Sequence, residues 1–167
     1  MKSPLRGLLL LLLIPALRAA DPVLTVTAPD KTLTFTAEEF AALPHMEISA
    51  YDPHGEATHK YSGVAMQEIL ARAGAPLGDK LRGKSLQLVV VAHSRDGYSI
   101  AFALAEFDPA FNDRSILLAD TEDGKPLPDY ASPFRMIIPG DKKAARWARM
   151  VDSMEIQSAV GAQAPKP

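Results

Sequence analysis

Arg135 stands directly before the apolar run of residues 136–138, and this position makes it a candidate for anion binding. An arginine is rarely placed beside a buried run unless an anionic partner compensates its charge. The planar guanidinium group can donate two parallel hydrogen bonds to a phosphate or a carboxylate. Two interpretations stay open: a contact with a small anionic ligand, or a structural salt bridge to an acidic residue such as Asp129.

A second group of cations follows in residues 140–147, which read GDKKAARW. A glycine-led loop of this kind can present backbone amides and side-chain cations to a phosphate. Lys143 and Arg146 are the candidate anion-binding residues of this segment, and a solvated basic surface turn is the alternative. We predict that Arg135 and Arg146 face one concave pocket. Tyr98 either lines a pocket or fills space at a strand edge.

Asp52, His54, Glu56 and His59 form an Asp-x-His-x-Glu-x-x-His cluster. Imidazole and carboxylate groups are common ligands of zinc and copper. In an extended strand the first three side chains would share one face, because successive side chains alternate. A proline and a glycine within the cluster favour a loop instead, and a polar surface loop needs no metal.

The 167-residue chain contains no cysteine, and this absence excludes several kinds of chemistry. A disulfide framework, a thiolate metal site and a cysteine nucleophile are ruled out. The sequence has neither a Gly-x-Ser-x-Gly elbow nor a glycine-rich nucleotide fingerprint. Its composition, 47% hydrophobic and 23% charged, is typical of a folded domain.

Residues 1–20 have the order of a secretory signal: a positively charged start, the apolar run of residues 8–14, and small residues at Ala19 and Ala20. The run is shorter than the ~20 residues that span a bilayer. We therefore predict cleavage after Ala19 or Ala20, a mature chain without a membrane span, and a periplasmic or secreted location. Cleavage takes away three of the 18 basic residues and none of the 20 acidic ones, which leaves a net charge of −5. Nucleic acid is therefore not an expected partner.

Residues 21–157 are expected to form a single α+β domain with a mixed sheet and short helices in the connections. The tail of residues 158–167, rich in Ala, Pro and Gln, is expected to be disordered. Alternating or continuously apolar segments predict strands at residues 23–26, 32–35, 46–51, 86–92, 98–102, 116–119, 136–138 and 150–156.

Two segments have the features of helices. Thr36 and Glu39 have capping-box spacing, which predicts a short helix that ends before Pro44. An apolar stripe predicts a second helix over residues 64–73, and Gly74 follows where a left-handed C-terminal residue belongs.

The order of these motifs resembles that of the sulfite oxidase-like molybdopterin-binding family. Residues 35–44 are similar to the family's helix entry and its leucine-proline, and residues 61–70 to its Gly-Val-x-Leu helix. The resemblance covers roughly residues 32–156 and implies the family's fold. Residues 96–98, 117–119 and 124–128 are similar to the strands and the turn that follow in the family. Residues 133–140, together with 146–147, are similar to its closing Pro-x-Arg, Val-Pro-Gly and Lys-Trp signature.

The resemblance also implies a cofactor, molybdopterin, and an oxidoreductase activity. It implies that Arg135 lies on the pterin phosphate side, that Arg146 contacts the anion, and that Tyr130 lies near a cofactor-contacting position. Catalytic members bind molybdenum through a cysteine on the strand before the Gly-Val helix. The corresponding residues 45–51 contain no cysteine, so the metal would lack its protein sulfur ligand. Whether the chain is an enzyme stays open.

Three functions remain, and a fold alone does not decide between them. The first, favoured by the missing thiolate, is a non-catalytic periplasmic module that binds a small anionic ligand or a periplasmic or membrane sensor protein. The second is a molybdopterin-dependent oxidoreductase that holds molybdenum without cysteine. The third is a periplasmic metal-binding protein that uses the loop of residues 52–59.

Overall fold

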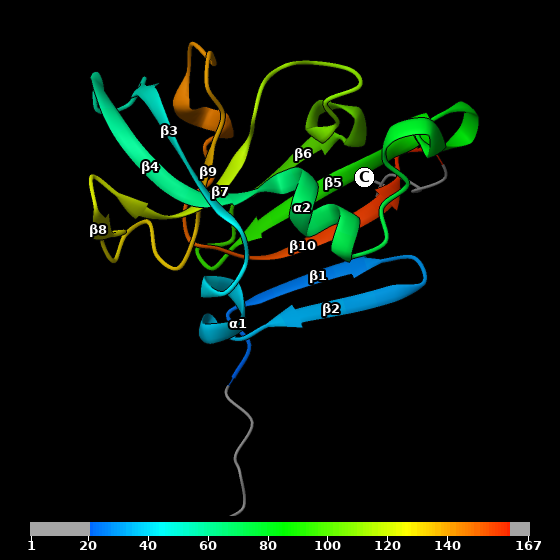
Figure 1. Ribbon diagram of the computed structural model, residues 1–167, viewed down its shortest axis with the longest axis horizontal. Helices are drawn as coiled ribbons and strands as arrows, with labels where there is room; N and C mark the ends of the chain where they lie inside the picture. Colours follow the sequence, from blue (N-terminus) through cyan, green and yellow to red (C-terminus); the bar gives the residue numbers. More distant parts are fainter. Residues whose placement is uncertain (1–20, 161–167) are drawn as a thin grey trace, which may run out of the picture.

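The structure, a computed structural model, describes residues 21–160 as an α+β domain built from two sheets (Figure 1). The fold class therefore agrees with the expectation. The expected signal segment, residues 1–20, and residues 161–167 of the expected tail lie outside the described residues. No helix within the described part is long and apolar enough to cross a membrane.

The first sheet has the strand order β2-β1-β10-β5-β6. It is mixed, because β1 pairs with β10 in parallel and the other neighbours are antiparallel. β10 runs to Ser158, which pairs with Leu88, so the ordered domain extends one residue into the expected tail. The strands are β1 (Leu24–Ala28), β2 (Lys31–Phe35), β5 (Leu88–Ser94), β6 (Ser99–Ala103) and β10 (Val151–Ser158).

The second sheet has the order β3-β4-β7-β8, and β9 also pairs with β7. All of its pairs are antiparallel, and the β3–β4 hairpin runs from the pair His45 and Val64 to the pair Asp52 and Ala57. The strands are β3 (His45–Asp52), β4 (Ala57–Ala65), β7 (Leu117–Glu122), β8 (Lys125–Pro126) and β9 (Arg135–Ile137).

The helices are short and lie in the connections. Before α1 (Ala37–Ala41), the capping box is confirmed: Thr36 Oγ1 accepts from the Glu39 amide, and the Glu39 carboxylate accepts from the Thr36 amide. The other helices are α2 (Met66–Arg72) and the 3-10 turns η1 (Gly78–Lys80), η2 (Gly83–Gln87), η3 (Leu104–Phe107) and η4 (Ala144–Arg146).

One hydrophobic core joins the two sheets and the helices. At Gly63 of β4, a Cβ atom would clash with the Leu118 carbonyl and lie 2.5 Å from the Ala119 Cα. Glycine therefore lets β4 approach the backbone of β7 closely. The largest fully buried side chains are Tyr61, Phe40, Phe102, Leu24, Met66, Ile69, Leu70, Leu104, Leu117, Leu118, Met136 and Ile137.

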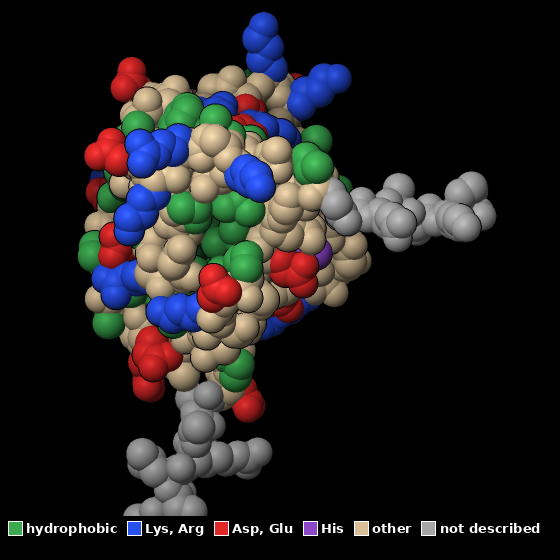
Figure 2. Space-filling view, turned by 90° about the vertical axis from the view of Figure 1, so that its right-hand side faces the viewer, with side chains coloured by type: hydrophobic (Ala, Val, Ile, Leu, Met, Phe, Trp, Pro, Cys, Tyr) green, Lys and Arg blue, Asp and Glu red, His purple; other side chains and the backbone are tan. Residues whose placement is uncertain are grey.

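The face shown in Figure 2 carries both signs of charge. Lys and Arg side chains are interspersed there with Asp and Glu side chains, and no continuous basic surface covers this face. Nucleic-acid binding needs a continuous basic surface. This face therefore offers no surface suited to nucleic acid.

Candidate functional site

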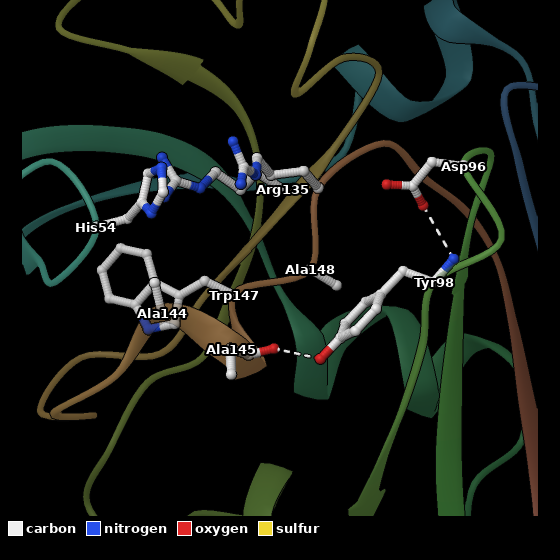
Figure 3. Close-up of a pocket in the computed structure, with 9 residues that line it drawn as sticks. His54, Asp96, Tyr98, Arg135, Ala144, Ala145, Trp147 and Ala148 are labelled. Carbon is white, nitrogen blue, oxygen red and sulfur yellow. Dashed lines mark hydrogen bonds between the residues drawn. The ribbon is translucent and has the colours of Figure 1, made fainter.

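A cavity of about 310 Å³ opens beside Arg135. It is bounded by β9, the β3–β4 turn, the β5–β6 turn and the segment that contains η4. Figure 3 shows His54 and Trp147 on one side of the view, Arg135 near its centre, and Asp96 and Tyr98 on the other side. The residues that line it are His54, Asp96, Tyr98, Arg135, Ala144, Ala145, Trp147, Ala148 and Arg149.

The side chain of Arg135 is buried and surrounded by acidic and aromatic groups. Its Nη2 donates to Asp52 Oδ2 at 2.7 Å, while Nη1 lies 3.3 Å from the Tyr61 hydroxyl and 3.5 Å from Glu122 Oε2. The guanidinium carbon is 5.7 Å from the centre of the Tyr61 ring and 5.3 Å from that of Trp147. Burial raises the pKa of the Tyr61 hydroxyl, which therefore stays protonated.

The salt-bridge interpretation of Arg135 describes this geometry, with Asp52 as the partner in place of Asp129. Asp52 ends β3 and is 5% exposed, and its Oδ1 accepts from the His54 amide at 2.8 Å. Burial by itself raises the pKa of the Asp52 carboxyl. The hydrogen bonds from Arg135 and from the His54 amide outweigh burial, so this pKa lies below its ordinary value.

One atom of Arg135 remains without a partner. Its Nε is buried and makes no hydrogen bond to any described residue. A buried N–H group that lacks an acceptor costs about 1–3 kcal/mol.

The structure does not bring Arg146 to the same cavity as Arg135. Arg146 donates to Asp141 Oδ2 and to Glu106 Oε2, both at 2.8 Å. Its guanidinium group packs over the ring of Phe102, 5.1 Å from the ring centre. The η4 turn therefore directs Arg146 towards η3 and β6, and the prediction of one shared pocket for the two arginines is wrong.

The remaining anion-binding candidates lie at the surface. Lys143 precedes η4, is exposed, and does not line the cavity. Tyr130 is 60% exposed, and its ring lies under the guanidinium group of Arg149 at 5.5 Å. Arg149 itself lines the cavity.

Arg149, Asp96 and Tyr98 complete the cavity wall. Among the lining residues, Arg149 is the arginine that has no carboxylate within ion-pair distance in the described part of the chain. The Asp96 carboxylate accepts from the Tyr98 amide at 2.9 Å, and the Tyr98 hydroxyl donates to the Ala145 carbonyl at 2.7 Å. Neither Arg149 nor Asp96 was a sequence candidate. The sequence did offer one signal for Arg149: it is a further arginine two residues after Trp147, next to the basic segment of residues 140–147.

The proposed metal-binding loop of residues 52–59 does not assemble its four candidates. The hairpin turns Asp52 inward to Arg135, leaves His54 at the cavity, and holds Glu56 exposed in the turn at φ +52°. His59 lies further along β4 and faces Asp123. The prediction that Asp52, His54, Glu56 and His59 form one metal site is therefore wrong. The turn bends the chain, so that the four side chains point in different directions.

The donor set of the cavity does not fit molybdenum held through a protein sulfur, because the chain contains no cysteine. It also does not fit a phosphate contact by Arg135 or Arg146, since each of these guanidinium groups already faces two carboxylates. Pockets for drug-sized ligands measure about 300–1,000 Å³. The cavity lies at the small end of that range and suits a compact ligand.

Comparison with known proteins identifies the family. The family model of the oxidoreductase molybdopterin-binding domain matches residues 52–163, and the chain belongs to this family. Its fold is similar to the sulfane dehydrogenase SoxCD from Paracoccus pantotrophus, with a TM-score of 0.62 and 19% sequence identity. The match covers 84% of this chain and 39% of that chain. No curated protein sequence matches.

Proposed function

We propose that this chain is a non-catalytic, exported binding module whose cavity beside Arg135 holds a small ligand with a carboxylate or other oxyanion group. The observation that carries this proposal is the guanidinium group of Arg149, which belongs to the cavity wall and has no carboxylate within ion-pair distance among the described residues. Hydrogen bonds between a charged donor and an oxyanion contribute about 1.5–3 kcal/mol each.

The charges around the cavity favour an anion of low charge. Arg135 is compensated by Asp52, and the positive charge of Arg149 is opposed by the carboxylate of Asp96 on the same cavity. A doubly charged phosphate ester would find little net positive charge there. Trp147 and Tyr98 also line the cavity, so a monocarboxylate with a small apolar or aromatic body fits best.

Binding of small monocarboxylates tests the proposal. Acetate, benzoate and inorganic phosphate are titrated calorimetrically into the wild type and into Arg149→Gln, with Arg72→Gln as a control on the exposed side of α2. We expect a monocarboxylate to bind best and Arg149→Gln to weaken it roughly 10- to 100-fold. Equal affinity of the wild type and Arg149→Gln would contradict a role of this cavity.

A molybdopterin-dependent oxidoreductase is the second candidate, and the family membership favours it. Protein purified from its native source that carries stoichiometric molybdenum and pterin, and that turns over sulfite or a sulfoxide, would replace the first proposal. In the binding-module proposal, a periplasmic or membrane sensor protein is the partner that would recognise the ligand-bound form.

A further inference from the structure

Three metal-binding side chains converge outside the cavity, where β4 pairs with the end of β7. His59 comes from β4, Glu122 ends β7, and Asp123 follows it. One ligand atom from each side chain lies within 4.8 Å of the other two. His59 Nδ1 is 2.7 Å from Asp123 Oδ2 and 3.5 Å from Glu122 Oε1.

These distances are close to those between the ligands of a tetrahedral ion. Two ligand atoms, each ~2.0–2.1 Å from zinc, lie about 3.3 Å apart when the geometry is tetrahedral. The separation of His59 Nδ1 from Glu122 Oε1 already has this value within a few tenths of an ångström. The separation of His59 Nδ1 from Asp123 Oδ2 is 2.7 Å, a hydrogen-bond length, and has to widen by about 0.6 Å to reach the tetrahedral value.

The backbone holds the three side chains in place. Tyr61 and Glu122 are register partners of β4 and β7. The Asp123 amide donates to the Lys60 carbonyl at 2.7 Å, and Asp123 Oδ1 accepts from the Lys60 amide at 2.9 Å. Asp123 Oδ2 is thereby left facing His59. Glu122 and Asp123 also line a surface depression, together with Lys125 and two prolines.

Two carboxylates face the imidazole ring of His59, those of Glu122 and Asp123. A cation bound between the three side chains would therefore be neutralised by two negative charges.

We propose that His59, Glu122 and Asp123 bind a divalent transition-metal ion, with Zn²⁺ as the type and water at the remaining position. One imidazole nitrogen and two carboxylate oxygens are a ligand set that zinc accepts. The site adjoins the Arg135 ion pairs, because Glu122 Oε2 also lies 3.5 Å from Arg135 Nη1, but none of its three ligands lines the cavity. The proposal does not depend on the function proposed for that cavity. Of the metal-ligand candidates in the sequence, the proposed site contains only His59. Glu122 and Asp123 take the place of the candidates in residues 52–56.

Titration of Zn²⁺ alone into the mature, metal-free protein tests the site. We expect one ion per chain in the wild type. His59→Gln and Asp123→Asn should each weaken binding by more than the roughly 10–100-fold that loss of an outer-shell partner costs. Co²⁺ in place of Zn²⁺ should give the intense visible absorption of a four-coordinate ion, and both variants should lose it.

The chain offers a matched control. His45 Nε2 lies 3.0 Å from Asp120 Oδ2, a histidine–aspartate pair on the same sheet that belongs to no three-residue ligand group among the described residues. His45→Gln should leave Zn²⁺ affinity unchanged. Circular dichroism establishes that each variant is folded, and if His59→Gln is not, Asp123→Asn decides the question. A wild type that binds no Zn²⁺ at millimolar concentration overturns the proposal, as does stoichiometric binding that persists in the folded variants.

Discussion

The guanidinium group of Arg135 is buried and lies near two carboxylates and two aromatic rings. A buried ion pair of this kind contributes little net stability, because desolvation of both charges offsets their attraction. Loss of one partner is different, since it leaves the other charge buried and uncompensated. Arg135 is therefore important for stability even if a ligand also contacts it.

Replacement of Arg135 by methionine should lower the free energy of unfolding by about 3–5 kcal/mol, because it leaves the buried Asp52 carboxylate without its cation. Urea denaturation measures this loss. The double variant Arg135→Met with Asp52→Leu should recover much of it, although the hydrogen bond from the His54 amide to Asp52 is also lost. A loss below about 1 kcal/mol for Arg135→Met would contradict the importance of the pair.

The sequence predicted that Arg135 needs an anionic partner, but it did not identify the partner. Asp52 is 83 residues away and reaches Arg135 only because the β3–β4 hairpin and the β4–β7–β9 pairing bring the two together. The same limit explains why His59 was grouped with its sequence neighbours. Its contact in the fold, Asp123, is 64 residues further along the chain.

At the scale of elements, the close contact of β4 with β7 depends on Gly63. A Cβ atom there meets the backbone of Leu118 and Ala119, which cannot rotate away as a side chain can. Gly63→Ala should therefore lower the free energy of unfolding by about 1–3 kcal/mol or more. Thermal and urea unfolding measure this loss.

Gly55→Ala is the control for Gly63→Ala, because its Cβ atom would lie 3.7 Å from Asp52 Oδ2, an ordinary contact. It should change stability by no more than about 0.5 kcal/mol, as is usual for an exposed position. If both variants were equally stable, the close approach of β4 and β7 would not constrain position 63.

His45 ties the start of β3 to β7. Its Nδ1 lies 2.8 Å from the Leu43 carbonyl and its Nε2 3.0 Å from Asp120 Oδ2, so the doubly protonated ring can donate to both. Burial lowers the pKa of His45, but these hydrogen bonds and the charge of Asp120 outweigh it and raise the pKa above 6.5. The stabilisation is therefore complete below pH 6.5 and is lost as the pH rises through the folded-state pKa.

His45→Gln should accordingly lower the free energy of unfolding more at pH 5.5 than at pH 8.5. The difference should stay below about 1 kcal/mol, because both partners are partly exposed. Denaturation at the two pH values measures it, and Asp120→Asn should remove most of the pH dependence. A larger effect of His45→Gln at pH 8.5 would have the wrong sign for this pair.

Local signals predicted the elements well, and tertiary pairing moved their ends. The helix expected over residues 64–73 begins at Met66, because Val64 and Ala65 pair with Leu118 and Leu117 in the sheet. The strand expected from residue 86 begins at Leu88, because Gly83–Gln87 form a 3-10 turn. Capping and periodicity act over a few residues, whereas strand pairing acts between distant segments.

At the scale of the whole molecule, export remains a prediction from residues 1–20. The mature protein should begin at Ala20 or Asp21, because the small residues at the end of the apolar segment form the recognition site of a signal peptidase. N-terminal sequencing of protein from its native source measures the cleavage site. Detection of Met1 or Lys2 as the first residue would contradict export through this signal.

The domain has one hydrophobic core that joins both sheets and α2. It spans 39% of the SoxCD chain that it resembles. A ligand that binds only the folded state at 100 times its Kd adds about 2.7 kcal/mol to the free energy of unfolding. In a domain of this size, that stabilisation corresponds to a rise in Tm of roughly 5–10 °C.

Because the cavity lacks a thiolate and the charges of Arg135 and Arg146 are compensated, we predict no such rise from molybdopterin. The protein is expressed in two hosts, one able and one unable to make molybdopterin, and Tm is measured by calorimetry. The two preparations should unfold at the same temperature and contain less than stoichiometric molybdenum. If the cofactor-producing host instead gave a protein with bound molybdenum and a Tm several degrees higher, the cavity would accept the cofactor without a cysteine. The compensated arginines could then not be the reason for excluding it.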